Sequence, residues 1–391
     1  MVTIEKLVYG GDGLSRGEGQ VTLTPFVLTG EQVEIEPGEV RSGVLRAGLK
    51  SVVEASADRV PPPCPYYGKC GGCQYQHATY DAQLRAKRAI LEETLQRVGR
   101  VTPPSDIALI SAEPWGYRNR AQFHIDQRKL GYRMRGSHKL IAIEQCPISS
   151  PKINDCIVVL NRMLRDARWP KFISQIEVFT DETQVQINVL EAGQVVAKRF
   201  FEWAAEEIPG FVPGVLEYGG FRVSPNSFFQ VNRFLIERMA EAVVGGDAGQ
   251  HALDLYSGVG LFSLPLARQF AQVTAVESGS GAVRDMEFNA GRAGVKVHAV
   301  GAIVDEYLRT MEARPDFVLA DPPRTGLGKT VVNKLVEWKP ERITVVSCDP
   351  STFARDLAGL MAGGYKIEDL TLIDLFPQTF HIETVCKLRL G

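Results

Sequence analysis

The sequence of 391 residues lacks a long apolar run and lacks a strong excess of charge of either sign. No apolar stretch approaches the roughly 20 residues that a membrane-spanning helix needs. The first residues contain no basic segment followed by an apolar block, which a secretory signal would show. We therefore expect a cytoplasmic protein that has no membrane partner. The formal net charge of −2 gives no reason, by itself, to expect a general binder of polyanions.

Cysteine is scarce, with seven residues in the whole chain. In a cytoplasmic protein, so few cysteines argue against a disulfide framework. Four of them nevertheless form a pattern: Cys64, Cys70 and Cys73, the last two separated by two glycines, and the distant Cys146, which precedes a proline. Glycines between thiolates let the backbone turn around a metal. The spacing alone leaves zinc, which it slightly favours, and an iron–sulfur cluster both open.

The distribution of glycine and apolar residues divides the chain into three parts. Residues 1–57 hold short alternating runs separated by glycines, which is typical of a small β-barrel or sandwich. Residues 58–222 begin with a stiff proline run, continue with an amphipathic helix over Tyr80–Gly99 that Gly99 would cap, and then show the alternation of an antiparallel sheet. Residues 223–391 alternate between strand-like and helix-like segments, which predicts an α/β domain.

Local charge differs from the total. Between Tyr80 and Leu140 there are twelve Lys and Arg against six Asp and Glu, interleaved with aromatic residues such as Tyr117, Phe123 and Tyr132. Such a segment suits a phosphate backbone with unstacked bases nearby. A solvated charged surface would give the same composition, so this segment alone does not decide between the two.

Two apolar runs in the last third of the chain end abruptly in polar turn residues. One run starts at Arg342 and stops at Cys348, which Asp-Pro follows; the other starts at Asp316 and stops at Asp321, before two prolines. Open α/β folds keep their ligands at the carboxyl edge of the sheet. Glu383 stands just before the last strand-like run, and an antiparallel last strand would bring it back to that edge. We therefore predict that a thiol and two carboxylates meet there, although a lone cysteine at a strand end is more often an apolar filler.

A glycine loop follows another predicted strand. Residues 252–260 read A-L-D-L-Y-S-G-V-G and precede an expected helix over Leu261–Gln269, and the next strand ends in Glu277, 19 residues after Gly258. A glycine loop lets the backbone approach a cofactor, and an acid at the end of the second strand can accept ribose hydroxyls. NAD would fit these features as well, although Ser263 stands where a dinucleotide site wants its third glycine.

The motifs D-P-P-R-x-G-L, S-C-D-P and F-P-x-T-x-H-I-E occur in this chain in that order. Together they resemble the signature of the S-adenosylmethionine-dependent RNA uracil-C5 methyltransferases, and the resemblance extends over nearly the whole chain. It implies Cys348 as covalent nucleophile and Glu383 as base. It also implies that the methyl donor is bound by four residues, namely Gln230 of F-x-Q-x-N, Tyr256, Glu277 and Asp321. Arg324 follows the proline pair where amino-group methyltransferases place an aromatic residue, which favours a ring carbon as the target.

The same resemblance bears on the first two parts of the chain. The segment L-V-Y-G-G-D-G-L-S-R looks like a TRAM domain, an OB-like barrel found on RNA-modifying enzymes. C-G-G-C and the later C-P are similar to the 4Fe–4S site of the ribosomal-RNA branch of the family, which implies four ligands: Cys64, Cys70, Cys73 and Cys146. Tyr117–Arg120 is similar to a family segment near the RNA and the target base. In one departure from the family, Gly301-Ala302 follows the third strand where an acid or amide near the adenine is usual, so the adenine contact stays unassigned, with Asp305 as one neighbour.

The expected architecture is therefore α/β: a C-terminal Rossmann-like methyltransferase sheet, an N-terminal TRAM barrel and a central α+β iron–sulfur domain. The expected activity is methylation of carbon 5 of a uridine in RNA by S-adenosylmethionine, in a monomer, with 23S rRNA favoured over tRNA by family analogy. Two other readings stand beside it. A DNA cytosine-C5 methyltransferase would carry its nucleophile in a Pro-Cys pair near the start of the catalytic domain, unlike Cys348. A non-catalytic RNA-binding metal module would not need Cys348 and Glu383 together.

Overall fold

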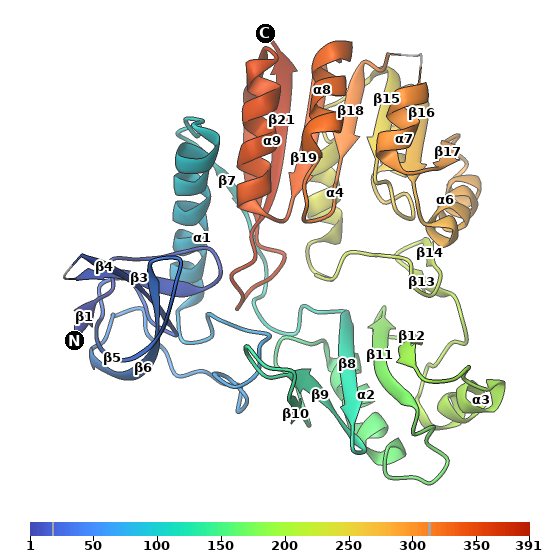
Figure 1. Cartoon of the computed structure of the whole chain (residues 1–391). Helices are drawn as coiled ribbons and strands as arrows, with labels where there is room; N and C mark the ends of the chain where they lie inside the picture. The colour runs from blue at the N-terminus through green and yellow to red at the C-terminus, as the bar shows by residue number, and fades with distance from the viewer. Residues whose placement is uncertain (18, 312–313) are drawn as a thin grey trace.

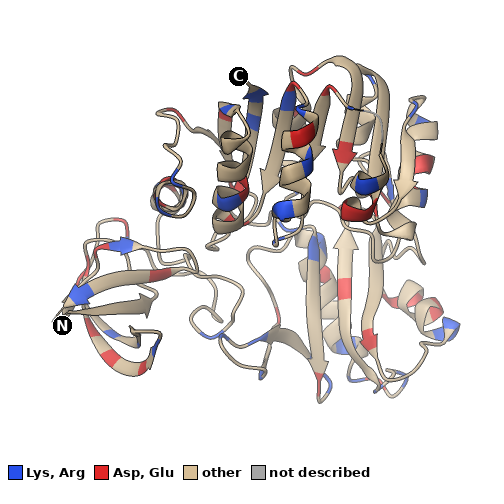
Figure 2. Cartoon of the chain, turned by 45° about the horizontal axis from the view of Figure 1, so that its top comes forward, with Lys and Arg blue, Asp and Glu red and all other residues tan. Residues whose placement is uncertain are grey.

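A computed structural model describes residues 1–17, 19–311 and 314–391. The chain builds three main sheets, one from each third of the sequence, with a long helix standing between the first and the last (Figure 1). Basic and acidic positions are interspersed over all three sheets (Figure 2). In the described part of the chain, no helix is both long and apolar enough to cross a bilayer.

The N-terminal sheet has six strands in the order β1-β5-β6-β4-β3-β2. Its strands are β1 (Val2–Thr3), β2 (Lys6–Leu7), β3 (Asp12–Gly17), β4 (Gln20–Pro25), β5 (Gln32–Arg41) and β6 (Val44–Glu54). The sheet curls over a small core of Ile4, Val27 and Val33. Gly13 allows this tight packing, because a Cβ there would lie 2.4 Å from Val27 and 2.7 Å from Ile4.

The helix predicted over Tyr80–Gly99 forms, but it ends differently. α1 covers Tyr80–Thr94 and continues as a π-helical turn, η1 (Leu95–Gly99). The left-handed residue that ends it is Arg100, with φ of 53°, and not Gly99. Gly99 serves close packing instead, because a Cβ there would lie 2.7 Å from the carbonyl oxygen of Ala354.

The central sheet is antiparallel, as its alternating sequence predicts. Its order is β10-β9-β8-β11-β12, formed by β8 (Arg120–Asp126), β9 (Lys129–Arg133), β10 (Leu140–Ala142), β11 (Ile173–Thr180) and β12 (Val185–Ala192). Helices α2 (Pro151–Met163) and α3 (Lys198–Glu207) contribute Ile157, Leu160 and Trp203 to its core. The hairpin of β13 (Leu216–Tyr218) and β14 (Phe221–Val223) connects it to the last third of the chain.

The large sheet has the order β17-β16-β15-β18-β19-β21-β20-β7. Its strands are β7 (Ala108–Ile110), β15 (Gly249–Leu255), β16 (Phe270–Glu277), β17 (His298–Gly301), β18 (Phe317–Ala320), β19 (Arg342–Ser347), β20 (Tyr365–Ile373) and β21 (Glu383–Leu390). Its helices are α4 (Ile236–Val244), α5 (Ser263–Leu266), α6 (Ser280–Ala293), α7 (Val304–Thr310), α8 (Gly328–Trp338) and α9 (Pro350–Ala362). The helix expected over Leu261–Gln269 shortens to the four residues of α5. The edge strand β7 comes from the second part of the chain, residues 58–222.

Strand β21 decides the geometry of the edge where the site lies. In sheet order, the five strands β17, β16, β15, β18 and β19 run parallel to one another. Strand β21, in contrast, pairs antiparallel with both β19 and β20. The antiparallel last strand expected from the sequence is therefore confirmed. The start of β21 lies beside the carboxyl ends of the parallel strands, where ligands of such sheets bind.

Candidate active site

Cys348 and Glu383 lie next to each other at this edge. Cys348 directly follows β19, and Glu383 is the first residue of β21. Ser347 pairs with Thr384 in the antiparallel register, so the next pair in the same register is Cys348 and Glu383. Side chains opposed in this way leave the same face of the sheet, with Cβ atoms about 5 Å apart. The Thr384 hydroxyl also donates to the Ser347 carbonyl at 3.2 Å and ties the two strand ends together.

The residues after Cys348 explain why the strand stops there. The Asp349 carboxylate accepts the backbone N–H groups of Ser351 and Thr352, at 2.9 and 3.0 Å, and so caps the N-terminus of α9. Pro350 occupies the first turn of that helix, where its missing N–H costs nothing. The thiol is partly exposed at the junction, whereas Cys156 and Cys386 are buried in the cores.

Three acidic groups share this edge, and burial raises the pKa of each of them. Asp321 follows β18, the neighbour of β19, and burial raises its pKa to about 7. Burial, and then the charge of Asp321, raises the pKa of Glu383 well above its usual range. Burial, and then the charge of Glu383, raises the pKa of the Cys348 thiol to about 12, while the Arg324 guanidinium acts in the opposite direction. The site therefore favours neutral forms of these groups until a positive charge enters it.

A small cavity beside this edge brings together three of the four predicted donor-binding residues. Gln230, Tyr256 and Asp321 all line a space of about 30 Å³, together with the loop residues Ser257 and Gly258. Tyr256 has φ of 64°, a left-handed conformation that is uncommon for a residue with a Cβ and that marks the sharp turn after β15. The turn brings the loop residues after β15 to the cavity wall, as a cofactor loop requires.

The fourth predicted residue, Glu277, holds this loop in place. Its carboxylate accepts N–H groups from Gly258 at 3.1 Å and from Gly279 at 2.6 Å. Because each carboxylate oxygen has two acceptor positions, capacity remains for ribose hydroxyls. Asp305, the neighbour considered for adenine, lies in α7 and contributes, after burial, to raising the pKa of Tyr256 to about 12.

Sequence reasoning did not single out Asp254, the last acid of β15. The side chain is fully buried, and burial raises its pKa to about 7. One carboxyl oxygen accepts from the Ser263 hydroxyl at 2.5 Å, and the other has no partner within the described protein. The Ser263 hydroxyl thereby connects the start of α5 to β15. The sequence signal for Asp254 is its position, because it is an acid in an otherwise apolar strand, two residues before Tyr256 of the glycine loop.

Two aromatic side chains at the site also escaped prediction. Phe228 is 61% exposed and lines both this small cavity and a second, larger cavity. Tyr9 reaches over from the N-terminal sheet, donates to the backbone carbonyl of Cys348 at 3.3 Å and packs edge-on against Phe380, with ring centroids 5.2 Å apart. A lone aromatic residue in a loop carries no sequence signal of such long-range contacts.

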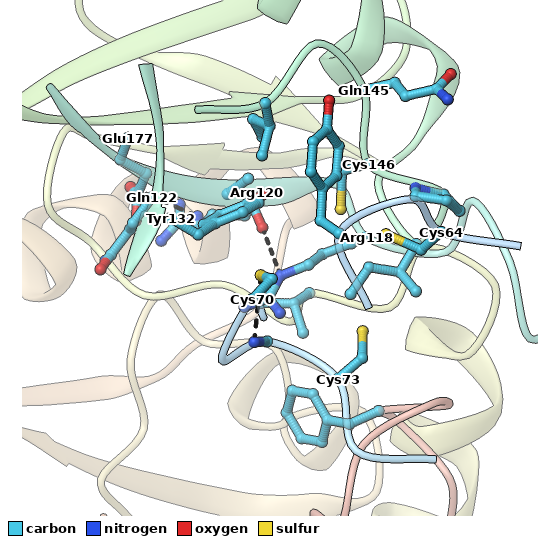
Figure 3. A pocket seen from close by; sticks show the side chains of 18 of the residues that line it. Cys64, Cys70, Cys73, Arg118, Arg120, Gln122, Tyr132, Gln145, Cys146 and Glu177 are labelled. Carbon is cyan, nitrogen blue, oxygen red and sulfur yellow. Dashed lines mark hydrogen bonds and ion pairs between the residues drawn. The ribbon is translucent and has the colours of Figure 1, made fainter. Parts of the chain in front are cut away.

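The second cavity, of about 600 Å³, is lined by all four predicted metal ligands, Cys64, Cys70, Cys73 and Cys146 (Figure 3). Burial, followed by the nearby Cys146 sulfur, raises the pKa of the Cys73 thiol, which shows that these thiols lie within electrostatic range of one another. Asn154 fixes Cys146 by accepting its N–H at 2.8 Å and donating to its carbonyl at 3.1 Å. Within residues 1–17, 19–311 and 314–391, no group of three His, Cys, Asp or Glu side chains could hold a metal ion.

The segment Tyr117–Arg120 crosses the floor of the same region, and most of it is buried. Asn119 is fully buried and donates to the Gln230 carbonyl at 3.1 Å. Arg120 is 7% exposed, stacks on Phe179 at 4.2 Å and donates to the Ser227 carbonyl at 2.8 Å. An arginine pair on a strand would more often lie on the surface, but Arg120 supports the segment that carries Phe228 and Gln230.

The sheet order, with a glycine loop after β15 and one antiparallel strand at β21, is that of an α/β methyltransferase, and comparison with solved structures agrees. The chain superposes on a tRNA (uracil-54, C5)-methyltransferase of Pyrococcus abyssi, solved with S-adenosyl-L-homocysteine, with a TM-score of 0.76 over 99% of this chain and all of the other. The sequence identity is 24%, so this likeness establishes the fold alone.

Sequence comparison establishes the family. A model of the tRNA (uracil-5-)-methyltransferase family matches residues 217–317 and 308–389. The 23S rRNA (uracil(1939)-C(5))-methyltransferase RlmD of Halomonas elongata is 32% identical, over 99% of this chain and 89% of that protein. A protein of Aquifex aeolicus named as an uncharacterized RNA methyltransferase is also 32% identical, over 99% and 98% of the two chains. The chain therefore belongs to the RNA uracil-5-methyltransferases, enzymes that depend on S-adenosylmethionine.

Proposed function

We propose that this enzyme methylates carbon 5 of a uridine in 23S rRNA. The RlmD relative, which matches the whole length of this chain, supports the ribosomal substrate. The tRNA enzyme with the same fold and the tRNA name of the family model keep tRNA as the second candidate. The observation that carries the proposal is the register of β19 and β21, whose last pair, Ser347 and Thr384, lies next to Cys348 and Glu383 in the sequence.

In the proposed reaction, Cys348 is the nucleophile. Carbon 5 of uracil is too weak a nucleophile to take a methyl group directly. Addition of the Cys348 thiolate to carbon 6 forms a C–S bond and turns the ring into an enolate whose carbon 5 can accept the methyl group. The donor supplies that methyl group from a sulfonium, whose positive charge would offset the acidic environment around Cys348 and favour the thiolate.

Glu383 completes the reaction as the base. Its carboxylate removes the proton from the methylated carbon 5, the carbon 5–carbon 6 double bond reforms, and the C–S electron pair returns to Cys348. A carboxyl group with a raised pKa suits this step, because it holds the proton once it has taken it. Asp321, on the neighbouring strand, is assigned to contact both the donor and the edge of the base.

The donor would bind against Gln230, Tyr256 and Asp321, with its ribose on Glu277, and the 30 Å³ cavity that the first three residues line would hold only part of it. The residues fit this ligand for two reasons. The loop at Gly258 lines the cavity, and its N–H donates to the Glu277 carboxylate, which still has acceptor positions. The partnerless oxygen of the buried Asp254, at the base of the loop, provides a further acceptor close to the same turn.

The four cysteines are assigned to a 4Fe–4S cluster. A zinc ion at about 2.3 Å from each sulfur would need all four sulfurs within about 4 Å of one another. The thiols line a 600 Å³ cavity, which also has room for a larger group with four thiolate ligands. The N–H of Gly72 lies 3.4 Å from the Cys70 sulfur, the kind of contact that tunes cluster potentials. A bound cluster would supply rigid cross-linking of three chain segments.

RNA would enter between the three sheets. Phe228 offers an exposed aromatic face where the two cavities meet, and stacking on such a face holds an unstacked base. Flipping the uracil out of a helix costs a few kcal/mol, which single-stranded loops reduce. The N-terminal sheet is assigned as a TRAM domain and would extend the RNA-binding surface. Its Tyr9 contacts the backbone of Cys348 at the edge of the large sheet.

A methyl-transfer assay tests this function. Labelled S-adenosylmethionine is incubated with transcribed 23S rRNA, transcribed tRNA and duplex DNA, using the wild type and Cys348→Ala. We expect the wild type to label C5 of a uridine in 23S rRNA and the variant to label nothing. If only tRNA is labelled, tRNA and not 23S rRNA is the substrate. If no RNA is labelled, the proposed function is wrong.

A separate experiment tests the cluster. An anaerobic preparation should show absorbance near ~400 nm and contain more iron than zinc; more zinc than iron would reject the cluster.

A further inference from the structure

Successive carbonyls of the segment that leads into Glu383 accept hydrogen bonds from residues outside its own sheet. This segment, the base loop, comprises residues 374–382 between β20 and β21. The carbonyl of Leu375 accepts from Asn232 at 3.1 Å, and that of Phe376 accepts from Lys87 at 3.0 Å. The carbonyl of Pro377 accepts from the Tyr117 hydroxyl at 3.1 Å. Three consecutive carbonyls of the base loop therefore take their donors from three distant parts of the chain.

The next carbonyl, that of Gln378, is bound by the cysteine segment. It accepts the backbone N–H groups of Gln74 and Tyr75, both at 2.9 Å, and these residues directly follow Cys73. Both donors and the acceptor residue are buried. Any group that fixes Cys73 in the chain thus also fixes the backbone of the base loop five residues before Glu383.

The side chain of Gln378 makes a second, reciprocal connection with α1. The Gln83 amide donates to the Gln378 side-chain oxygen at 3.0 Å, and its own oxygen accepts the Gln378 backbone N–H at 2.9 Å. Gln378 is 2% exposed and has φ of 68°, a left-handed conformation that persists only where surrounding contacts fix it. The two hydrogen bonds of Gln83 therefore stabilise one conformation of the base loop.

We propose that Gln83 and the Cys73–Tyr75 segment position Glu383, so that the cysteine site controls the proton-removal step and not only the fold of the RNA-binding part. This proposal rests on the proposed function. Gln83 and Gln378 touch no reacting atom; they act as positioning residues through the base loop. The proton still passes from carbon 5 to the Glu383 carboxylate, and the C–S electron pair still returns to Cys348.

A shift of the base loop should affect methyl transfer and elimination differently, which a purely structural role of Gln83 would not do. If the loop shifts while Cys348 stays in place, addition to carbon 6 and methyl transfer continue, but elimination slows. The methylated RNA then stays bonded to Cys348. A generally destabilised enzyme would lose methyl transfer and elimination together.

The first test compares Gln83→Leu with Gln96→Leu, a control at an exposed glutamine in the helical turn that continues α1. For Gln83→Leu at full iron content, we expect turnover to fall at least tenfold and single-turnover methyl transfer to change less than threefold. A gel-stable, methyl-labelled protein–RNA adduct should accumulate. The control should match the wild type. Equal loss of turnover and methyl transfer, or no loss in Gln83→Leu, would overturn the proposal.

The second test uses the wild type and needs no catalysis. Hydrogen exchange is measured on the anaerobically prepared protein before and after the metal is removed with a chelator and oxidant. We expect faster exchange in the peptide of residues 374–383 as well as in that of residues 64–76, and no change in residues 270–293. Retained protection of 374–383 would overturn the proposal. Failure of the proposed function would look different, as a wild type that methylates no RNA.

Discussion

Lys87 and Asp374 form a fully buried ion pair, with the ammonium nitrogen 2.6 Å from the carboxylate, between α1 and the start of the base loop. Removing one partner leaves an uncompensated buried charge. We therefore expect Lys87→Met to lower the free energy of unfolding by about 3 to 5 kcal/mol. The matched control is Arg85→Met, which breaks an exposed pair with Asp58 on the same helix and should cost at most about 1 kcal/mol. Denaturant unfolding of both variants measures the difference, and equal effects would contradict this account of the pair.

The reactivity of Cys348 should rise with pH. The thiolate is the reactive form, and the pKa of the free protein's thiol is about 12, above any ordinary assay pH. The rate of alkylation of Cys348 by iodoacetamide, followed by mass spectrometry, should therefore increase about tenfold per pH unit between 7 and 9. Sinefungin, which carries a positive charge near the position of the sulfonium, should increase the rate at pH 7. A rate that is independent of pH over this range would contradict the raised pKa.

Glu277 should contribute strongly to donor binding. Glu277→Ala removes the proposed acceptor for the ribose and the anchor of the loop at Gly258. Loss of charged hydrogen bonds of this kind costs about 1.5 to 3 kcal/mol, or roughly 10- to 150-fold in affinity. Calorimetric titration with S-adenosylhomocysteine provides the measurement. Glu287→Ala, at an exposed acid on α6, is the control and should leave the affinity unchanged. Similar affinities for the two variants would remove Glu277 from the donor site.

Tyr9 should influence catalysis from another sheet. Tyr9→Phe deletes the hydroxyl that donates to the Cys348 carbonyl but keeps the ring against Phe380. Since a single hydrogen bond contributes about 0.5 to 1.5 kcal/mol, kcat should fall roughly 2- to 10-fold. Tyr9→Ala, which also removes the ring, should reduce kcat further. Steady-state kinetics with both variants tests this, and a Tyr9→Ala enzyme with unchanged kcat would show that the contact is not used.

The sequence could predict those features that follow from local pattern and simple topology. Turn residues after apolar runs located Asp321 and Cys348, and parallel strands necessarily bring their carboxyl ends to one edge. Antiparallel return of the last strand then brought in Glu383. The alternation of the middle third correctly indicated an antiparallel sheet.

The remaining features depend on contacts between distant segments, which local pattern does not encode. Nothing in A-L-I indicated that residues 108–110 form the outer strand of the large sheet. The burial of Arg120 against Phe179 depends on packing between β8 and β11. The pairing of Gln83 with Gln378 joins residues 295 positions apart. For the same reason Gly99 was assigned as a helix cap, although its lack of a side chain serves the approach of α9.

The most direct test of the account follows the fate of the C–S bond in Glu383→Gln. This variant keeps Cys348 and the shape of the site but cannot remove the proton from carbon 5. Incubated with methyl-labelled donor and 23S rRNA, it should transfer one methyl group and remain covalently joined to the RNA through Cys348, as a labelled adduct that survives denaturing electrophoresis. The double variant Cys348→Ala/Glu383→Gln should give no adduct. Release of methylated RNA by Glu383→Gln at the wild-type rate would contradict the pairing of Cys348 with Glu383 as nucleophile and base.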